Sequence, residues 1–99
     1  MDQLKMEILK LLKKRKKMSR YELTMRTGES DRQVRNAIAE LRDEGHMIGI
    51  TASGGYSLNN KTDFNRAIAI YKARANKEQK RIRAMIRTLE NENQIRMEI

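Results

Sequence analysis

One short stretch of the chain carries side chains suited to recognising nucleobases. Residues 30–44 read SDRQVRNAIAELRDE, and their apolar residues recur at helical spacing on one face. The opposite face carries guanidinium and amide groups at Arg32, Gln33, Arg35 and Asn36. Arginine matches the major-groove edge of guanine, and asparagine or glutamine matches that of adenine. Taken alone, such a face is more typical of a solvated amphipathic helix, so the prediction depends on the surrounding elements.

The ends of this predicted helix are well marked. Ser30 and Gln33 form a capping box, in which each side chain is expected to bond the other's backbone N–H. Gly45 follows the last periodic residue, where a left-handed conformation ends a helix. The buried stripe is predicted to contain Val34, Ala37, Ile38 and Leu41.

A second capped helix comes directly before it. Ser19 and Glu22 form another capping box, which predicts a short helix over residues 20–27 that ends at Gly28. Two helices joined by so short a glycine-containing turn cannot lie antiparallel side by side. The order predicts a helix-turn-helix arrangement.

The remaining elements of the small domain are a first helix and a hairpin. Residues 2–15 have amphipathic spacing, and residues 47–51 and 55–58 read as two strands joined by a tight loop at 52–54. In the first helix the predicted buried residues are Leu4, Ile8, Leu11 and Leu12, with Leu9 at the edge. In the helix over residues 20–27, Leu23 is expected to face inward, with Tyr21 or Met25 partly covered. The hairpin is expected to be anchored by Ile48, Ile50, Tyr56 and Leu58. The hairpin corresponds to a wing whose tip carries Ser53 but no basic residue.

A long helix is predicted after the hairpin. Thr62 is the expected N-cap, and the helix is expected to run to about Asn93. Its later part has an apolar stripe, which we expect to dimerise with a second copy: Ile82, Met85, Ile86 and Leu89. The alternative is that this part folds back on the first helix. The predicted domains are residues 1–60 and a basic helix over 61–99.

Composition limits the classes of function. The 99 residues carry a net charge of +9, with 35% charged residues, no cysteine, one histidine and a mean hydropathy of −0.84. The charge favours an anionic partner, most often nucleic acid. Without cysteine, and with His46 alone, we expect no disulfide, metal, cofactor or enzymatic activity. No apolar window is long enough for a transmembrane helix, and a cytoplasmic location is expected.

The positive charge lies mainly on the flanks of the small domain. Residues 1–17 contain seven basic and two acidic residues, whereas residues 18–60 contain five basic and six acidic residues. We expect phosphate contacts from the basic run Lys13, Lys14, Arg15, Lys16 and Lys17, and from Arg20, Arg26, Arg42 and Ser53. A solvated helix end is an equally good interpretation of the basic run.

These motifs together resemble a known family. The capping box at residues 19–22 with Leu23, Gly28, the helix from Ser30, and the GGYSL segment at 54–58 are similar to the winged helix-turn-helix of the biotin-operon repressor type. The resemblance covers about half the chain. It implies three helices with a two-stranded wing, and a recognition helix that presents Arg32, Gln33, Arg35 and Asn36 to DNA. Because a basic helix follows the wing, we expect no small-molecule effector.

Two classes of function follow. The first is a sequence-specific double-stranded DNA-binding protein, a small transcriptional regulator of bacterial or phage type. The second is a winged-helix protein-interaction adaptor, or a phage replication or packaging factor. DNA binding at low salt would discriminate between these classes.

Overall fold

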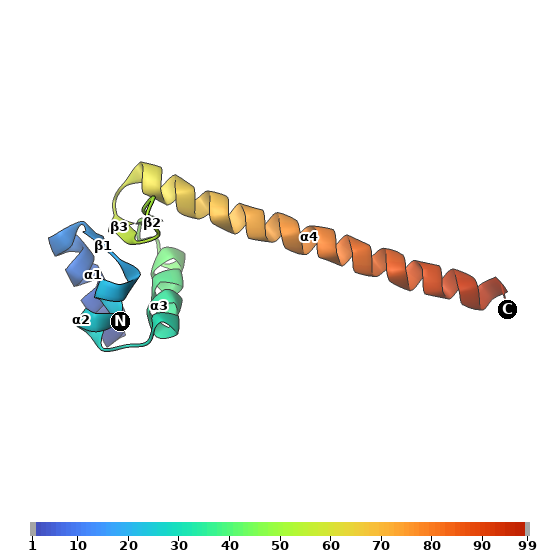
Figure 1. Ribbon diagram of the computed structural model, residues 1–99, viewed down its shortest axis with the longest axis horizontal. Helices are drawn as coiled ribbons and strands as arrows, with labels where there is room; N and C mark the ends of the chain where they lie inside the picture. Colours follow the sequence, from blue (N-terminus) through green and yellow to red (C-terminus); the bar gives the residue numbers. More distant parts are fainter. Residues whose placement is uncertain (1, 99) are drawn as a thin grey trace. The chain divides into compact units, whose positions relative to one another are not determined.

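The computed structural model describes residues 2–98 of the chain and the side chains of residues 2–92. The fold is mainly helical with a small antiparallel sheet and a long C-terminal helix, as predicted (Figure 1). The elements in order are α1 (Gln3–Arg15), β1 (Lys17–Met18), α2 (Arg20–Thr27), α3 (Asp31–Asp43), β2 (Ile48–Ile50), β3 (Tyr56–Leu58) and α4 (Lys61–Glu98). The chain forms two compact units, Met1–Ile68 and Ala69–Ile99, so the first turns of α4 belong to the first unit.

The predicted helix boundaries in the first unit are confirmed by their caps. Asp2 accepts the Leu4 N–H at the start of α1, and complete capping boxes begin α2 at Ser19 and α3 at Ser30. Gly28 ends α2 with a φ of 73°, a left-handed conformation that costs glycine little.

The sheet contains one strand more than the sequence predicted. β2 and β3 form the expected hairpin, with Gly49 opposite Ser57, but β1 pairs antiparallel with the other edge of β3. The strand order is therefore β1-β3-β2, and the prediction of a two-stranded sheet was wrong. The chain turns from α1 into β1 at Lys16, whose φ of 69° is unusual for a residue with a side chain.

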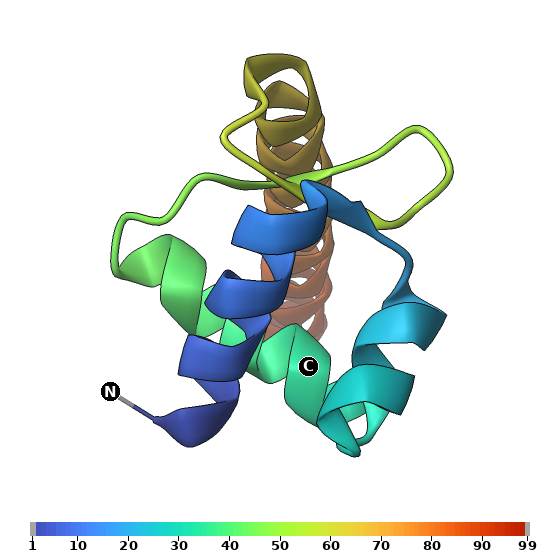
Figure 2. The same cartoon turned by 90° about the vertical axis from the view of Figure 1, so that its left-hand side faces the viewer.

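Helices α1, α2 and α3 pack against one another, and α1 and α3 also pack against the sheet (Figure 2). The core cluster contains Ile8, Leu9, Leu12, Met18, Leu23, Val34, Ala37, Ile38, Leu41, Ile48 and Tyr56. Leu4, Leu11 and Leu58 are partly buried against it. Most of the predicted anchors are therefore confirmed, and Met18 of β1 is an addition.

The start of α4 is held to the sheet by a close backbone contact and a buried polar cluster. A Cβ atom at Gly49 would lie 2.5 Å from the Asp63 backbone carbon, so only glycine fits there. The buried Ser57 hydroxyl donates to Asp63 at 2.7 Å, and Arg66 Nη1 donates to Asp63 and to the Ile50 carbonyl, both at 2.8 Å. These contacts fix the first turn of α4 against β2 and β3.

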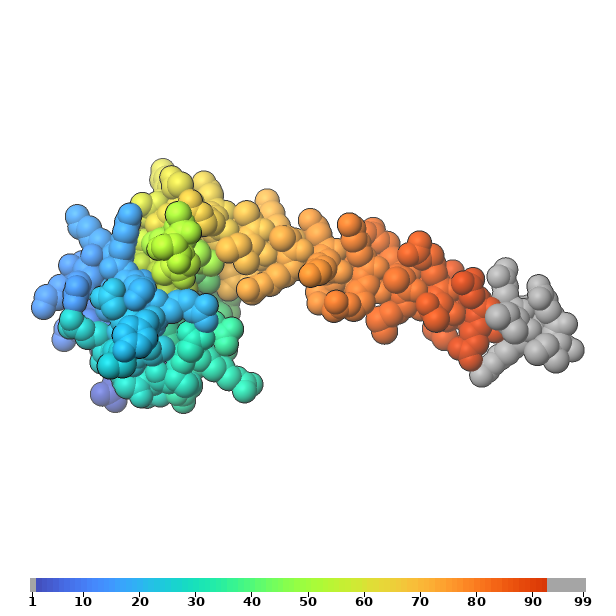
Figure 3. All heavy atoms as spheres, in the orientation of Figure 1, coloured from blue at the N-terminus to red at the C-terminus, as the bar shows by residue number. Residues whose placement is uncertain are grey.

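Both predicted ends of α4 were wrong. The helix begins at Lys61, and Asn60 accepts the Asp63 N–H at 2.9 Å, so Asn60 caps the helix instead of Thr62. The helix continues past Asn93 to Glu98. The second unit contains only the rest of α4, from Ala69 onward (Figure 3). Within the described residues, no helix is both long and apolar enough to cross a membrane.

Candidate nucleic-acid interface

The buried stripe of α3 determines which of its side chains face outward. Val34, Ala37, Ile38 and Leu41 are at most 5% exposed. With these positions fixed in the core, Arg32, Arg35 and Asn36 lie on the remaining surface of the helix, and all three are exposed. Arg32 and Asn36 make no side-chain hydrogen bond or ion pair with another described residue. They can therefore bind an external partner without first breaking a contact.

The short turn after α2 brings the start of α3 beside the start of α2. Arg20 donates two hydrogen bonds to Asp31, from Nε to Oδ1 at 3.1 Å and from Nη2 to Oδ2 at 2.6 Å. The Nε of Arg35 lies 3.0 Å from the same carboxylate. Two arginines from successive helices thus share Asp31 and are held at one end of α3.

This cluster has defined charges. The hydrogen bond from Arg20 lowers the pKa of Asp31, and the same bond raises the pKa of Arg20. Asp31 therefore stays ionised, and its charge at the first turn of α3 also interacts favourably with the helix dipole. The cluster of Arg20, Asp31 and Arg35 carries one net positive charge.

Gln33 was predicted to read bases, but its side chain is part of the helix cap. Its Oε1 accepts the Ser30 N–H at 3.2 Å and the Ser30 hydroxyl at 3.1 Å. Recognition of adenine by an amide uses its oxygen and its nitrogen together. Because the oxygen is already engaged, we leave Gln33 out of the proposed base-reading set.

Arg42 was predicted to bind phosphate, but its side chain is turned into the fold. Its Nε donates to the Ile48 carbonyl at 2.8 Å, and its guanidinium carbon lies 6.0 Å from the centre of the Tyr56 ring. Arg42 therefore joins the end of α3 to the sheet, and we leave it out of the interface.

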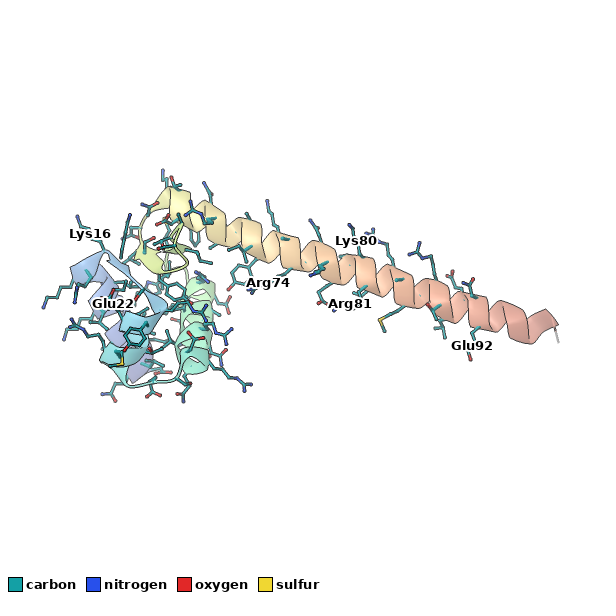
Figure 4. The ribbon with its side chains drawn as sticks, viewed as in Figure 1. Lys16, Glu22, Arg74, Lys80, Arg81 and Glu92 are labelled. Carbon is teal, nitrogen blue, oxygen red and sulfur yellow. The ribbon has the colours of Figure 1, made fainter. Side chains whose placement is uncertain are left out.

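The basic run at the end of α1 is exposed, and part of it lines a hollow to which α3 contributes no residue. Lys13, Lys16 and Lys17 border a hollow of about 440 Å³ together with residues 57–60. Lys14 and Arg15 are also exposed, and Arg15 lies 3.9 Å from Glu22 of α2. Lys16 and Glu22 are labelled in Figure 4.

Two further predicted phosphate contacts are exposed. Arg26 lies in the last turn of α2. Ser53 lies in the loop between β2 and β3, where its hydroxyl is 3.1 Å from that of Thr51. Both side chains are accessible to an external partner.

Sequence analysis missed Asp31 and misjudged two side chains on α2. The spacing of Asp31 and Arg35, four residues apart on one helix, is a visible signal for their ion pair. The pairing of Asp31 with Arg20 depends on how α2 meets α3. Tyr21 or Met25 was expected to be partly covered, but they are 71% and 66% exposed.

The predicted dimerisation stripe on α4 is exposed within the single chain. Ile82, Met85, Ile86 and Leu89 have exposed fractions of 46%, 65%, 49% and 60%. Among the described residues, no group of three or more histidine, aspartate or glutamate side chains is arranged to hold a metal ion.

Comparison of the chain with models of known protein families, with characterised proteins and with solved structures finds no match.

Proposed function

We propose that this protein is a winged helix-turn-helix protein that binds double-stranded DNA sequence-specifically and acts as a small transcriptional regulator. The observation that carries the proposal is the outer surface of α3. A capped helix, packed by its apolar stripe on two other helices, presents Arg32, Arg35 and Asn36 directly after a glycine turn. These residue types match the edges of guanine and adenine.

Base reading and backbone binding are assigned to different residues in this proposal. Arg32 and Arg35 recognise guanine, and Asn36 recognises adenine. Phosphate contacts come from the exposed residues Lys13, Lys14, Arg15, Lys16, Lys17, Arg20, Arg26 and Ser53. Arg20 has a second role, because its bond to Asp31 helps to fix the cluster that holds Arg35.

The proposal also includes a homodimer through α4. An exposed apolar stripe of the kind formed by residues 82–89 is unfavourable in water and favours association. Helix-turn-helix proteins bind two half-sites as dimers, and this doubles the number of bases that are read.

A mobility-shift titration tests DNA binding most simply. We expect the protein to shift random duplex DNA at micromolar concentration in low salt, and to bind a selected sequence more tightly at physiological salt. The matched variant replaces Arg32, Arg35 and Asn36 with alanine. It should retain weak binding to random DNA and lose the preference for the selected sequence.

A protein-interaction adaptor is the second candidate, and one observation favours it. Tyr21 and Met25, four residues apart on α2, expose an apolar surface that DNA binding does not explain. Absence of any shift with random duplex at low salt would favour this function over the first.

A further inference from the structure

The second unit has an apolar stripe with opposite charges at its two ends. The stripe comprises Ile82, Met85, Ile86 and Leu89, whose spacing of three and four residues keeps them on one face of α4. Before and within the stripe the helix is strongly basic, with Lys72, Arg74, Lys77, Lys80, Arg81, Arg83 and Arg87. After it the described residues are acidic, at Glu90 and Glu92.

This asymmetry discriminates between the two ways of pairing identical helices. A parallel pair would bring each basic segment beside its own copy, and like charges at a helix interface repel. An antiparallel pair brings the acidic end of each helix beside the basic segment of the other. Both arrangements bring the two stripes together, and the charges favour the antiparallel orientation.

The charged residues also lie on the correct flanks for an antiparallel pair. Arg81 and Glu92 are three helical turns apart, within about 20° of each other around the axis. Both project from the same side of α4 as Arg74, whereas Lys80 projects from another side (Figure 4). Arg83 and Glu90 are two turns apart and lie on the opposite flank of the stripe.

The two charge pairs give the same alignment independently. In an antiparallel pair each flank faces the same flank of its partner, so Arg81 meets the partner's Glu92 and Arg83 meets the partner's Glu90. Both pairings require a two-fold axis at the same point, between Ile86 and Arg87. In this alignment Met85 packs against the partner's Leu89, and the two Ile86 side chains lie next to the axis.

We infer that α4 associates with α4 of a second copy as an antiparallel pair centred between Ile86 and Arg87. The inference deepens the homodimer in the proposed function and rests on it, but it does not depend on DNA binding. Arg81 lies 3.4 Å from Glu78 within its own helix, and both side chains are more than 60% exposed. Arg81 can therefore turn from this solvated pair toward the partner's Glu92.

Single cysteines test the orientation, because the chain has no cysteine of its own. In the antiparallel pair the two copies of residue 86 are adjacent, whereas the two copies of residue 82 are about 13 Å apart along the axis. A disulfide needs Cα atoms within about 7 Å. We expect Ile86→Cys to form a disulfide-linked dimer on mild oxidation and Ile82→Cys to remain unlinked.

The outcomes of this test are distinct. Efficient linking of Ile82→Cys would overturn the antiparallel orientation in favour of a parallel dimer and leave the proposed homodimer intact. Sedimentation of the full chain as a monomer, even at protein concentrations far above micromolar, would overturn both. Neither result would bear on DNA binding by α3.

A charge swap supplies a second test that uses no cysteine. Arg81→Glu should weaken the dimer about tenfold, because two attractive contacts become repulsive. The double variant Arg81→Glu with Glu92→Arg exchanges the two charges, so residues 81 and 92 of the two copies attract each other again and dimerisation should recover. A double variant as weak as Arg81→Glu, with the helical circular dichroism signal unchanged, would contradict the inference.

Discussion

At the scale of single residues, Asp31 holds two arginines of the proposed interface in place. It accepts hydrogen bonds from Arg20 and forms an ion pair with Arg35. The Asp31 carboxylate stays ionised because the hydrogen bond from Arg20 lowers its pKa. In the proposed complex, a carboxylate beside DNA would repel phosphates, so we expect Asp31 to act by orienting the arginines. By restraining the two long side chains, Asp31 reduces the conformational entropy that they lose on binding.

Replacing Asp31 with asparagine tests this role. Asp31→Asn removes a negative charge from the interface, and we expect binding to random duplex to become about threefold tighter at low salt. The preference for a selected sequence should fall, because Arg20 and Arg35 are no longer held in place. Competition binding with selected and random duplexes measures both effects. Tighter binding to both DNAs with an unchanged preference would show that Asp31 has no orienting role.

At the scale of elements, the helices were more predictable than the sheet. Capping boxes at Ser19 and Ser30 and a left-handed glycine at position 28 are local signals, and they fixed where α2 and α3 begin and where α2 ends. β1 carries no such signal. Its two residues follow a lysine-rich run, and they form a strand only because the edge of β3 is available to pair with them.

The candidate site was predictable to the same extent. The helical period identified Arg32, Arg35 and Asn36 as outward-facing residues, since the apolar stripe fixes the rotation of α3. It could not show that Arg42 reaches the Ile48 carbonyl, because that contact depends on the path of the chain after the helix. The start of α4 was misjudged for a related reason. Asn60 and Thr62 are both suitable caps, and the Ser57–Asp63 contact decides between them.

The contact between β2 and α4 leaves no space for a side chain at position 49. Gly49→Ala should lower the free energy of unfolding by about 2–3 kcal/mol, since the new methyl group would meet backbone atoms that cannot move independently. Gly28→Ala is the matched control. Position 28 has open space around it but a left-handed backbone, so Gly28→Ala should lower the free energy of unfolding by about 1 kcal/mol. Denaturant titration of both variants would contradict this account if Gly28→Ala proved the more costly.

The polar cluster at the start of α4 should make stability depend on pH. The Ser57 and Arg66 hydrogen bonds lower the pKa of Asp63 below its ordinary value of 3.8. An ionised Asp63 therefore contributes stability above that value, and this contribution disappears as the pH falls through the lowered pKa. Asp63→Asn should be less stable than wild type at pH 7, and the difference should shrink in acid. Thermal unfolding measured from neutral to strongly acidic pH would contradict this if the difference stayed constant.

At the scale of the whole molecule, the proposed function predicts that different parts of the chain supply affinity and specificity for DNA. Residues 18–60, which include α3, carry five basic and six acidic residues, so we expect the basic flank at residues 13–17 to contribute much of the attraction to phosphates. In this account the flank determines how tightly any DNA is bound, and α3 determines which DNA is preferred.

Neutralising the flank should therefore weaken binding without changing preference. Replacing Lys13, Lys14, Lys16 and Lys17 with glutamine should weaken binding to all duplexes alike. The dependence of log K on log salt should flatten by about 0.9 for each phosphate that the variant no longer neutralises. The same four changes to arginine conserve the charge and should keep the wild-type slope. A weaker sequence preference in the glutamine variant would mean that the flank also reads bases.

The most direct test of the central claim is selection of bound duplexes from a random pool, with wild type and Arg35→Ala compared in parallel. Wild type should enrich one sequence that contains guanine or adenine at defined positions. Arg35→Ala should lose discrimination at one guanine position, by about 1–3 kcal/mol, and keep the others. Enrichment of the same sequence to the same degree by both proteins, or of none by wild type, would contradict base reading by α3.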